Sequence, residues 1–126
     1  MKVYATDIDS DCRDYIGRID EIHNKIKFIE MDVKDLSKYF DRGDVDYLVS
    51  RDVFMFVEDT EKYFDDITSI VKKGIRQMGC YMKENKRMKN KITPVKISKE
   101  LEKRGWKVEI EYLNWYKGGY FIKADK

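Results

Sequence analysis

The chain has 126 residues, with 26 basic and 24 acidic side chains and a net charge of +2. This length suits one domain, 1–126, and the near balance of charge excludes a molecule that attracts nucleic acid over its whole surface. No apolar run is long enough to span a bilayer, and no leader pattern opens the sequence, so we expect a soluble, cytoplasmic protein that does not enter a membrane. With two cysteines and one histidine, neither a disulfide framework nor a metal site is expected.

The first half of the chain alternates strand and helix signals. Three short apolar runs predict strands, over residues 3–8, 26–31 and 45–50. Between the first two runs, apolar side chains recur every three or four residues and predict a helix over residues 10–23. A short helical turn is expected over residues 35–40, before the third strand.

The second half opens with a helix and closes with a hairpin. A helix capped by Asp59 or Thr60 is predicted to continue to Gly79, because its apolar stripe keeps helical register. Beyond Gly79 the elements are a strand, a polar loop, a helix and the two strands of a hairpin, over residues 80–83, 84–91, 94–105, 108–112 and 120–122. Alternating strands and helices predict an α/β fold with a mostly parallel sheet covered on both faces.

The opening strand ends in an acidic residue typical of nucleotide-binding domains, but no glycine-rich turn precedes it. Asp7 closes this strand, and in nucleotide-binding α/β domains an acidic residue at that position holds the ribose hydroxyl groups. Such domains place a glycine-rich turn after an earlier strand, and no such turn precedes residue 3. The sequence therefore predicts a sheet that lacks the first strand of this kind of domain.

Five segments together resemble the class I S-adenosylmethionine-dependent methyltransferases, in the order that the family has them. They are residues 3–8, 26–33, 46–50, 79–85 and 104–108. Residues 3–8 resemble the family's V-Y-G-V-D-I strand, and residues 46–50 its F-D-x-V-x strand. The resemblance implies a three-layer, Rossmann-like methyltransferase fold with a C-terminal antiparallel hairpin and without the family's first strand.

The resemblance also implies a cofactor, S-adenosylmethionine, and residues that would bind it. Asp7 takes the position of the ribose-binding acid, and Asp32 with the backbone amide of Val33 takes the position that reads the adenine. Ile8 and Ser50, which lie at strand ends, complete the implied cofactor contacts. No catalytic residue is assigned.

Some of these residues also have a plainer interpretation. A carboxylate at a strand end, such as Asp7 or Asp32, commonly caps the turn that follows. Residues 54–57 are apolar where many family members carry a histidine pair, and they fit buried packing better than a platform for stacking bases. Without a glycine-rich loop to align the methionine end of the cofactor, we expect weak cofactor binding and little activity from the chain alone.

A basic loop follows the expected fourth strand. Its cations are Lys83, Lys86, Arg87, Lys89 and Lys91. If that strand is parallel to its neighbours, the loop lies at the sheet edge where α/β domains bind ligands, and it is a candidate contact for nucleic-acid phosphates. A solvated loop in a lysine-rich chain is the alternative.

Three functions stay open: a degenerate methyltransferase-like domain, a non-catalytic nucleic-acid-binding protein, and a self-assembling protein on the same fold. Absence of a central strand uncovers sheet edges, so we expect a homodimer. We also expect the strands at residues 3–8 and 45–50 to pair directly as neighbours.

Overall fold

The strands of the protein form two sheets. The computed structural model describes residues 2–14 and 26–126. In the first sheet, β1 (Val3–Asp7) pairs in parallel with β2 (Ile26–Glu30). The second sheet has the order β3-β4-β6-β5. Its strands in chain order are β3 (Val45–Arg51), β4 (Val71–Cys80), β5 (Lys107–Tyr112) and β6 (Gly119–Asp125).

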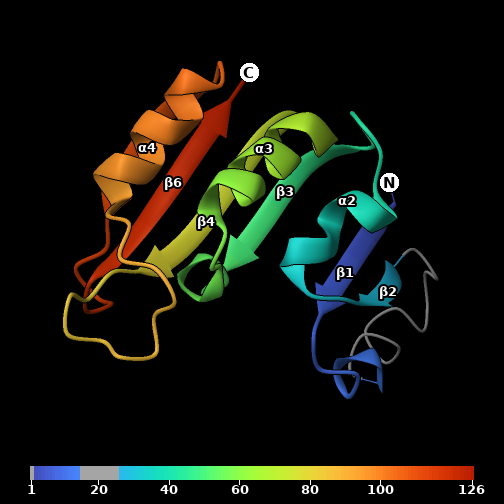
Figure 1. Ribbon diagram of the computed structural model, residues 1–126, viewed down its shortest axis with the longest axis horizontal. Helices are drawn as coiled ribbons and strands as arrows, with labels where there is room; N and C mark the ends of the chain where they lie inside the picture. Colours follow the sequence, from blue (N-terminus) through green and yellow to red (C-terminus); the bar gives the residue numbers. More distant parts are fainter. Residues whose placement is uncertain (1, 15–25) are drawn as a thin grey trace.

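Within the second sheet, β4 is parallel to β3 and antiparallel to β6, which lies between β4 and β5 (Figure 1). The α/β class and the C-terminal antiparallel hairpin are therefore confirmed. Most of the expected helix over residues 10–23 lies outside the described residues. In the described part of this range, residues 12–14 are helical.

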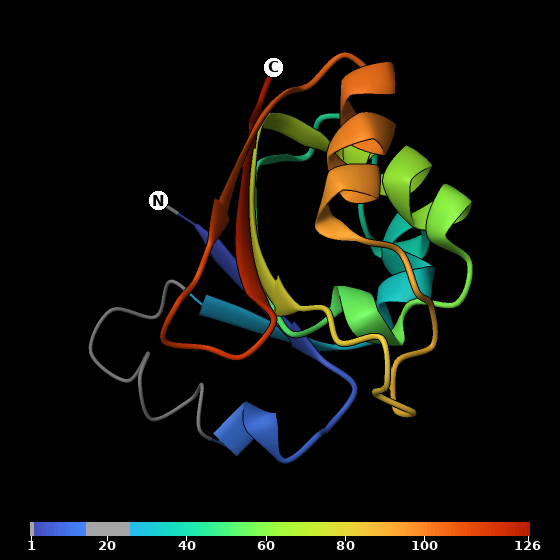
Figure 2. The ribbon, with the colours of Figure 1, turned by 90° about the vertical axis from the view of Figure 1, so that its left-hand side faces the viewer.

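The helices over residues 36–39, 60–70 and 94–103 lie together on one side of the sheets (Figure 2). They are α2 (Leu36–Tyr39), α3 (Thr60–Ile70) and α4 (Pro94–Lys103), with 3-10 turns η1 (Val33–Asp35) and η2 (Phe54–Phe56). Asp59 caps α3 by accepting from the amide of Lys62, and Thr93 caps α4 in the same way, as side chains of these types do at helix starts. The core lies between these helices and the sheets and includes Phe64 and Leu101, both fully buried.

The boundary between α3 and β4 differs from the expectation of a helix to Gly79 and a strand over residues 80–83. α3 ends at Ile70, and Val71 already begins β4. A Cβ on Gly79 would lie 2.8 Å from the Tyr120 hydroxyl, so this glycine makes room for the side chain of Tyr120 on β6. Pairing with a strand on each side therefore overrides the helical spacing of apolar residues in this segment.

The expected direct pairing of residues 3–8 with residues 45–50 is wrong. In Figure 1, β1 lies between β2 and β3 and points the same way as β3, but among the described residues β1 pairs with β2 and β3 pairs with β4. The helix layer holds both strands in place. The ring of Tyr4 on β1 packs edge-on against Phe40 at 5.2 Å, and Lys62 of α3 donates to the carbonyl of Lys34 at 2.7 Å.

Candidate functional site

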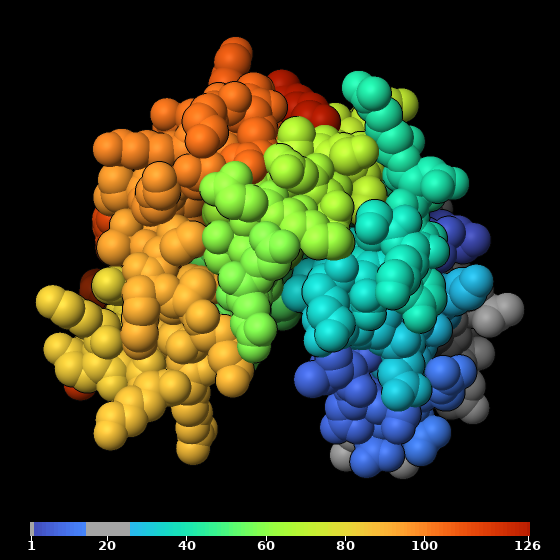
Figure 3. All heavy atoms as spheres, in the orientation of Figure 1, coloured from blue at the N-terminus to red at the C-terminus, as the bar shows by residue number. Residues whose placement is uncertain are grey.

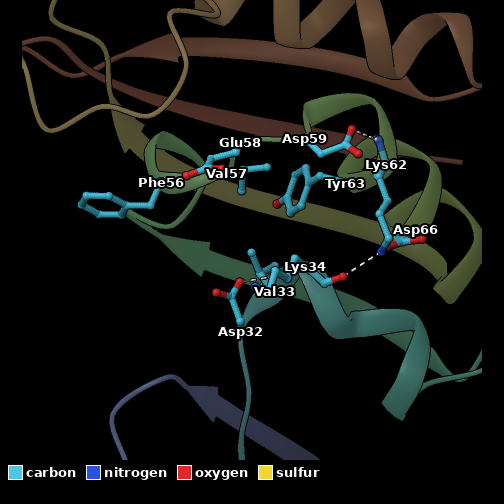
Figure 4. Close-up of a pocket in the computed structure, with 10 residues that line it drawn as sticks. All are labelled: Asp32, Val33, Lys34, Phe56, Val57, Glu58, Asp59, Lys62, Tyr63 and Asp66. Atoms are coloured by element: carbon cyan, nitrogen blue, oxygen red, sulfur yellow. Dashed lines mark hydrogen bonds and ion pairs between the residues drawn. The ribbon is translucent and has the colours of Figure 1, made fainter.

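A pocket of about 240 Å³ opens beyond the carboxyl ends of β2 and β3 (Figure 4). It lies between the segment that follows β2 and the segment that follows β3. Its lining residues are Asp32, Val33, Lys34, Phe56, Val57, Glu58, Asp59, Lys62, Tyr63 and Asp66. The carboxyl ends of parallel strands are where α/β sheets bind their ligands, so this pocket is the candidate site.

Asp32 and Val33 form the wall next to β2. The carboxylate Oδ1 of Asp32 accepts from the Lys34 amide at 3.0 Å and caps η1, so the plainer interpretation of this residue is realised in the structure. Asp32 caps η1 and also lines the pocket, together with Val33. Val33 also packs against the main core, which keeps this wall in place.

The opposite wall is apolar and comes from η2. Phe54 and Met55 are buried, as the sequence predicted. Phe56 differs, because its side chain is 52% exposed and lines the pocket beside Val57. Sequence reasoning treated the three residues alike and missed this aromatic surface.

Two residues of the lining are buried, Val57 and Tyr63 of α3, and the Tyr63 hydroxyl donates to Gln77 Oε1 at 3.3 Å. Burial raises the pKa of Tyr63 well above its ordinary value, although the Ser50 hydroxyl acts in the opposite direction. The phenol therefore stays neutral at physiological pH. Ser50 itself does not line the pocket.

Lys62 and Asp66 close the α3 side of the pocket. The Lys62 ammonium contacts Asp66 Oδ2 at 2.5 Å and also bonds to the Lys34 carbonyl, so it links α3 to η1. These two residues are four positions apart on a helix, a spacing typical of surface ion pairs. The spacing alone did not predict that they line a pocket.

Asp7 and Asp32 lie at the ends of neighbouring strands. The Asp7 carbonyl accepts from the Met31 amide at 3.0 Å, which ties the end of β1 to the residue before Asp32. The carboxylate of Asp7 is exposed and accepts from the Asp9 amide at 2.9 Å. Ile8, 70% exposed, follows it. Neither Asp7 nor Ile8 lines the pocket, but Figure 3 shows the surface hollowed between the N-terminal segment (blue) and the green segment of η2.

The basic loop after β4 is anchored beside η2. Asn90 donates from its side chain to the carbonyls of Phe54 at 2.9 Å and Val57 at 2.8 Å. Met88 is buried against Met55, and the Lys89 amide donates to the Met55 carbonyl at 2.7 Å. The loop thus supports the apolar wall, a role of Asn90 that the sequence did not indicate.

The five predicted cations of this loop are all exposed. They are Lys83, Lys86, Arg87, Lys89 and Lys91. Lys91 donates to the carbonyl of Asn85 at 2.5 Å. Within the described ranges, none of the five forms an ion pair.

Residues 2–14 and 26–126 include both cysteines of the chain. Cys12 and Cys80 are free thiols. This part of the chain contains no group of three or more His, Cys, Asp and Glu side chains that could hold a metal ion. None of its helices is long and apolar enough to cross a membrane.

Comparison with known proteins gives one family and many similar folds. A family model described as a methyltransferase domain matches residues 1–76, more than half of the chain. No curated protein matches the sequence.

Three solved structures illustrate the similarity of fold. An S-adenosylmethionine-dependent methyltransferase from Aquifex aeolicus is 13% identical, with a TM-score of 0.71 over 98% of this chain and 68% of its own. A Haloferax volcanii protein in complex with the Trm112 methyltransferase activator is 14% identical, with a TM-score of 0.78 over 98% of this chain and 71% of its own. The magnesium protoporphyrin IX methyltransferase of Synechocystis, with bound S-adenosylhomocysteine, is 14% identical, with a TM-score of 0.72 over 99% of this chain and 64% of its own. Each match includes both sheets, and the chain spans about two thirds of each neighbour.

Proposed function

The chain belongs to the methyltransferase domain family, and on that premise we propose that it binds S-adenosylmethionine by the adenosine part of the cofactor. One observation carries the proposal. The Met31 amide donates to the Asp7 carbonyl, so Asp7 lies beside the end of β2, and Asp32, the residue after Met31, lines the pocket. Binding of S-adenosylhomocysteine by the similar Synechocystis enzyme supports the choice of ligand.

The pocket suits the nucleoside end of the cofactor. A volume of about 240 Å³ is below the roughly 300 to 1,000 Å³ of pockets that enclose a whole drug-sized ligand. Phe56 and Val57 offer an apolar wall to the flat adenine, and the Asp32 carboxylate opposite can accept from its amino group. Asp7, at the neighbouring strand end, offers a carboxylate to the ribose hydroxyl groups.

The proposed affinity is low. Each hydrogen bond to a charged carboxylate contributes about 1.5 to 3 kcal/mol at best. After the entropy of association is subtracted, two such bonds and one apolar wall support dissociation constants in the micromolar to millimolar range.

Little methyl transfer is proposed for this chain alone. The bound cofactor would supply an activated methyl group on its sulfonium. Transfer of such a group depends mainly on alignment with the acceptor. The residues proposed here hold the adenosine end, and they leave the methionine end without a described binding surface.

Calorimetric titration with S-adenosylhomocysteine tests the proposal. The Asp7→Asn variant should lose measurable binding while its circular dichroism spectrum is kept, because an exposed carboxylate adds little to the core. Asp9→Asn is the matched control, since Asp9 is an exposed neighbour that accepts only a local amide bond from Asp11. Sub-micromolar binding, or an Asp7→Asn variant that binds as tightly as the parent, would contradict the proposal.

Nucleic-acid binding is a second candidate, and the exposed basic loop favours it. Anisotropy of a labelled single-stranded oligonucleotide should show affinity that falls with salt concentration, as contacts to phosphates require. The double variant Lys86→Glu and Arg87→Glu should abolish binding, whereas Lys99→Glu on α4 should have little effect. Equal binding by both variants would exclude the loop as the contact surface.

A further inference from the structure

We propose that the loop between β5 and β6, residues 113–118, joins the basic loop after β4 in one binding track for single-stranded nucleic acid, and that Trp115 stacks on a base of that strand. The inference rests on the second candidate function for the phosphate contacts of the basic loop. It goes beyond that function in naming the residue that contacts the bases and in requiring that the bases are unpaired.

Trp115 is an exposed aromatic side chain with one face already covered. Its side chain is 67% exposed, whereas Trp106 is 3% exposed and donates to the Thr68 hydroxyl at 3.0 Å. The ring of Trp115 stacks on that of Tyr116, with 6.0 Å between the centroids and 23° between the planes. The exposed remainder of the indole is available to another planar group, such as a nucleic-acid base.

The loop that carries Trp115 is held in place by hydrogen bonds. The Gly119 amide donates to the Tyr116 carbonyl at 2.8 Å, and the Leu113 amide donates to the Gly119 carbonyl at 3.0 Å. The Tyr116 hydroxyl donates to Asp52 at 3.0 Å, so the ring that supports Trp115 is fixed as well. Because the indole is positioned before a ligand arrives, stacking of a base on it costs little ordering entropy.

This loop is bonded to the start of the basic loop. The Tyr81 amide donates to the Gly118 carbonyl at 2.8 Å. Tyr116 packs against the buried cluster that contains Met88, which lies between two cations of the basic loop. Figure 2 shows both loops leaving the same end of the second sheet. The indole of Trp115 and the basic side chains therefore lie along one end of this sheet.

Positive charge is concentrated along the binding track. The basic loop has five cations and one acid, Glu84, and Lys117 adds an exposed cation close to Trp115. Within the described ranges, Lys117 forms no ion pair. Since the whole chain has a net charge of only +2, the rest of the molecule is net negative. A polyanion is therefore attracted to this end of the sheet rather than to the whole surface.

A single strand fits the binding track better than a duplex or a membrane. The bases of a duplex already stack on one another, so only an unpaired base offers a face to the indole. Insertion into a membrane needs several apolar side chains at one tip. The tip of this loop has Asn114 before Trp115 and Lys117 after Tyr116, and Tyr116 is bonded to Asp52.

Tryptophan fluorescence tests the stacking contact. The probe is a single strand of about eight thymidine nucleotides, a length within the usual site sizes. Its binding should quench the emission of Trp115, because Trp106 is buried. The matched probe is a strand of the same length made of abasic sites, which keeps the phosphates and lacks the bases. We expect the abasic strand to bind about 5 to 100 times more weakly and to cause little quenching.

Three variants separate stacking from charge. Trp115→Ala should weaken binding of the thymidine strand by about 5- to 100-fold, without changing its salt dependence or the binding of the abasic strand. Trp115→Phe keeps a ring and should retain most of the affinity. Tyr39→Ala, which removes an exposed aromatic side chain on α2, is the control and should bind like the parent. All three should keep the melting transition of the parent, because these side chains are exposed.

The inference is overturned if Trp115→Ala binds the thymidine strand like the parent, or if the two strands bind equally. Salt-dependent binding in either case would leave the second candidate function standing. Failure of both strands to bind would overturn the inference and that candidate together. Tighter binding to vesicles that contain phosphatidylserine than to the thymidine strand would assign Trp115 to a lipid surface and also overturn the inference. No cofactor is present in these experiments, so none of the outcomes tests binding of S-adenosylmethionine.

Discussion

The Tyr116 hydroxyl donates a hydrogen bond to Oδ1 of Asp52 at 3.0 Å, and so joins the loop between β5 and β6 to the turn that leaves β3. Asp52 has a φ of 55°, and it is the one residue other than glycine with positive φ in the described part of the chain. Burial, with Cys80 and Asp52 nearby, raises the pKa of Tyr116 well above its ordinary value, so this side chain remains a donor. The bond holds the backbone that leads into η2 and the pocket.

Asp52→Ala should destabilise the protein by about 1 to 3 kcal/mol, because alanine loses the acceptor and tolerates the left-handed conformation poorly. Asp52→Asn should cost less, since asparagine adopts that conformation more readily and keeps an acceptor oxygen. Urea denaturation measures both values. An alanine variant as stable as the parent would show that the turn is held by other contacts.

Asn90→Ala should cost about 1 to 3 kcal/mol, because the carbonyls of Phe54 and Val57 lose their side-chain donor. Since those carbonyls flank Phe56, the variant should also weaken binding of S-adenosylhomocysteine in the same titration. Asn85→Ala is the control in the same loop, where the side chain accepts only from the Arg87 amide at 2.9 Å. If Asn90→Ala and Asn85→Ala change stability and binding equally, Asn90 does not position the wall that carries Phe56.

Gly79→Ala should cost about 1 to 3 kcal/mol through overpacking, because a Cβ would lie 2.8 Å from the hydroxyl of Tyr120, a side chain with 2% exposure that has no room to move. Gly74→Ala is a useful comparison. Its nearest neighbours are the ring of Tyr47 and the Asp125 carboxylate, both of which are exposed enough to turn away. Thermal melting should rank Gly79→Ala below Gly74→Ala, and the reverse order would contradict this account of β4.

Acid should weaken the ion-pair cluster around Arg104, which joins the end of α4 to α3. Arg104 bonds Glu100 at 2.8 Å and Asp65 of α3 at 2.8 Å, and its guanidinium lowers the pKa of Glu100 from 4.5 to about 2. A carboxyl with a lowered pKa in the folded state contributes stability that is present above pH 4.5 and lost as the pH falls toward 2.

The Glu100→Gln variant should therefore lose less stability than the parent between pH 4.5 and 2, as measured by urea denaturation at each pH. Glu61→Gln is the control, because the Glu61 side chain is 66% exposed and its pair with Arg104 is screened by water. Parallel stability curves for Glu100→Gln and the parent would contradict the role given to Glu100.

Structural features that depend only on residues close in the sequence could be predicted. Asp59 and Pro94 mark helix starts because capping and a fixed φ operate within one turn. The alternation from Lys107 onward indicates the hairpin for the same reason. Asp7 and Asp32 could be placed at strand ends, since strand ends follow from local apolar runs.

Long-range contacts decided the rest. Residues 71–79 carry a helical spacing, and only pairing with β3 and β6 makes them a strand. Phe54 and Phe56 are the same residue type two positions apart. Phe54 is buried because it packs against the rings of Tyr63 and Phe64, whereas Phe56 is exposed and lines the pocket. Among the described residues, β1 pairs with β2 and β3 with β4, and β1 does not pair with β3. Such pairing between distant segments is not encoded in the spacing of nearby side chains.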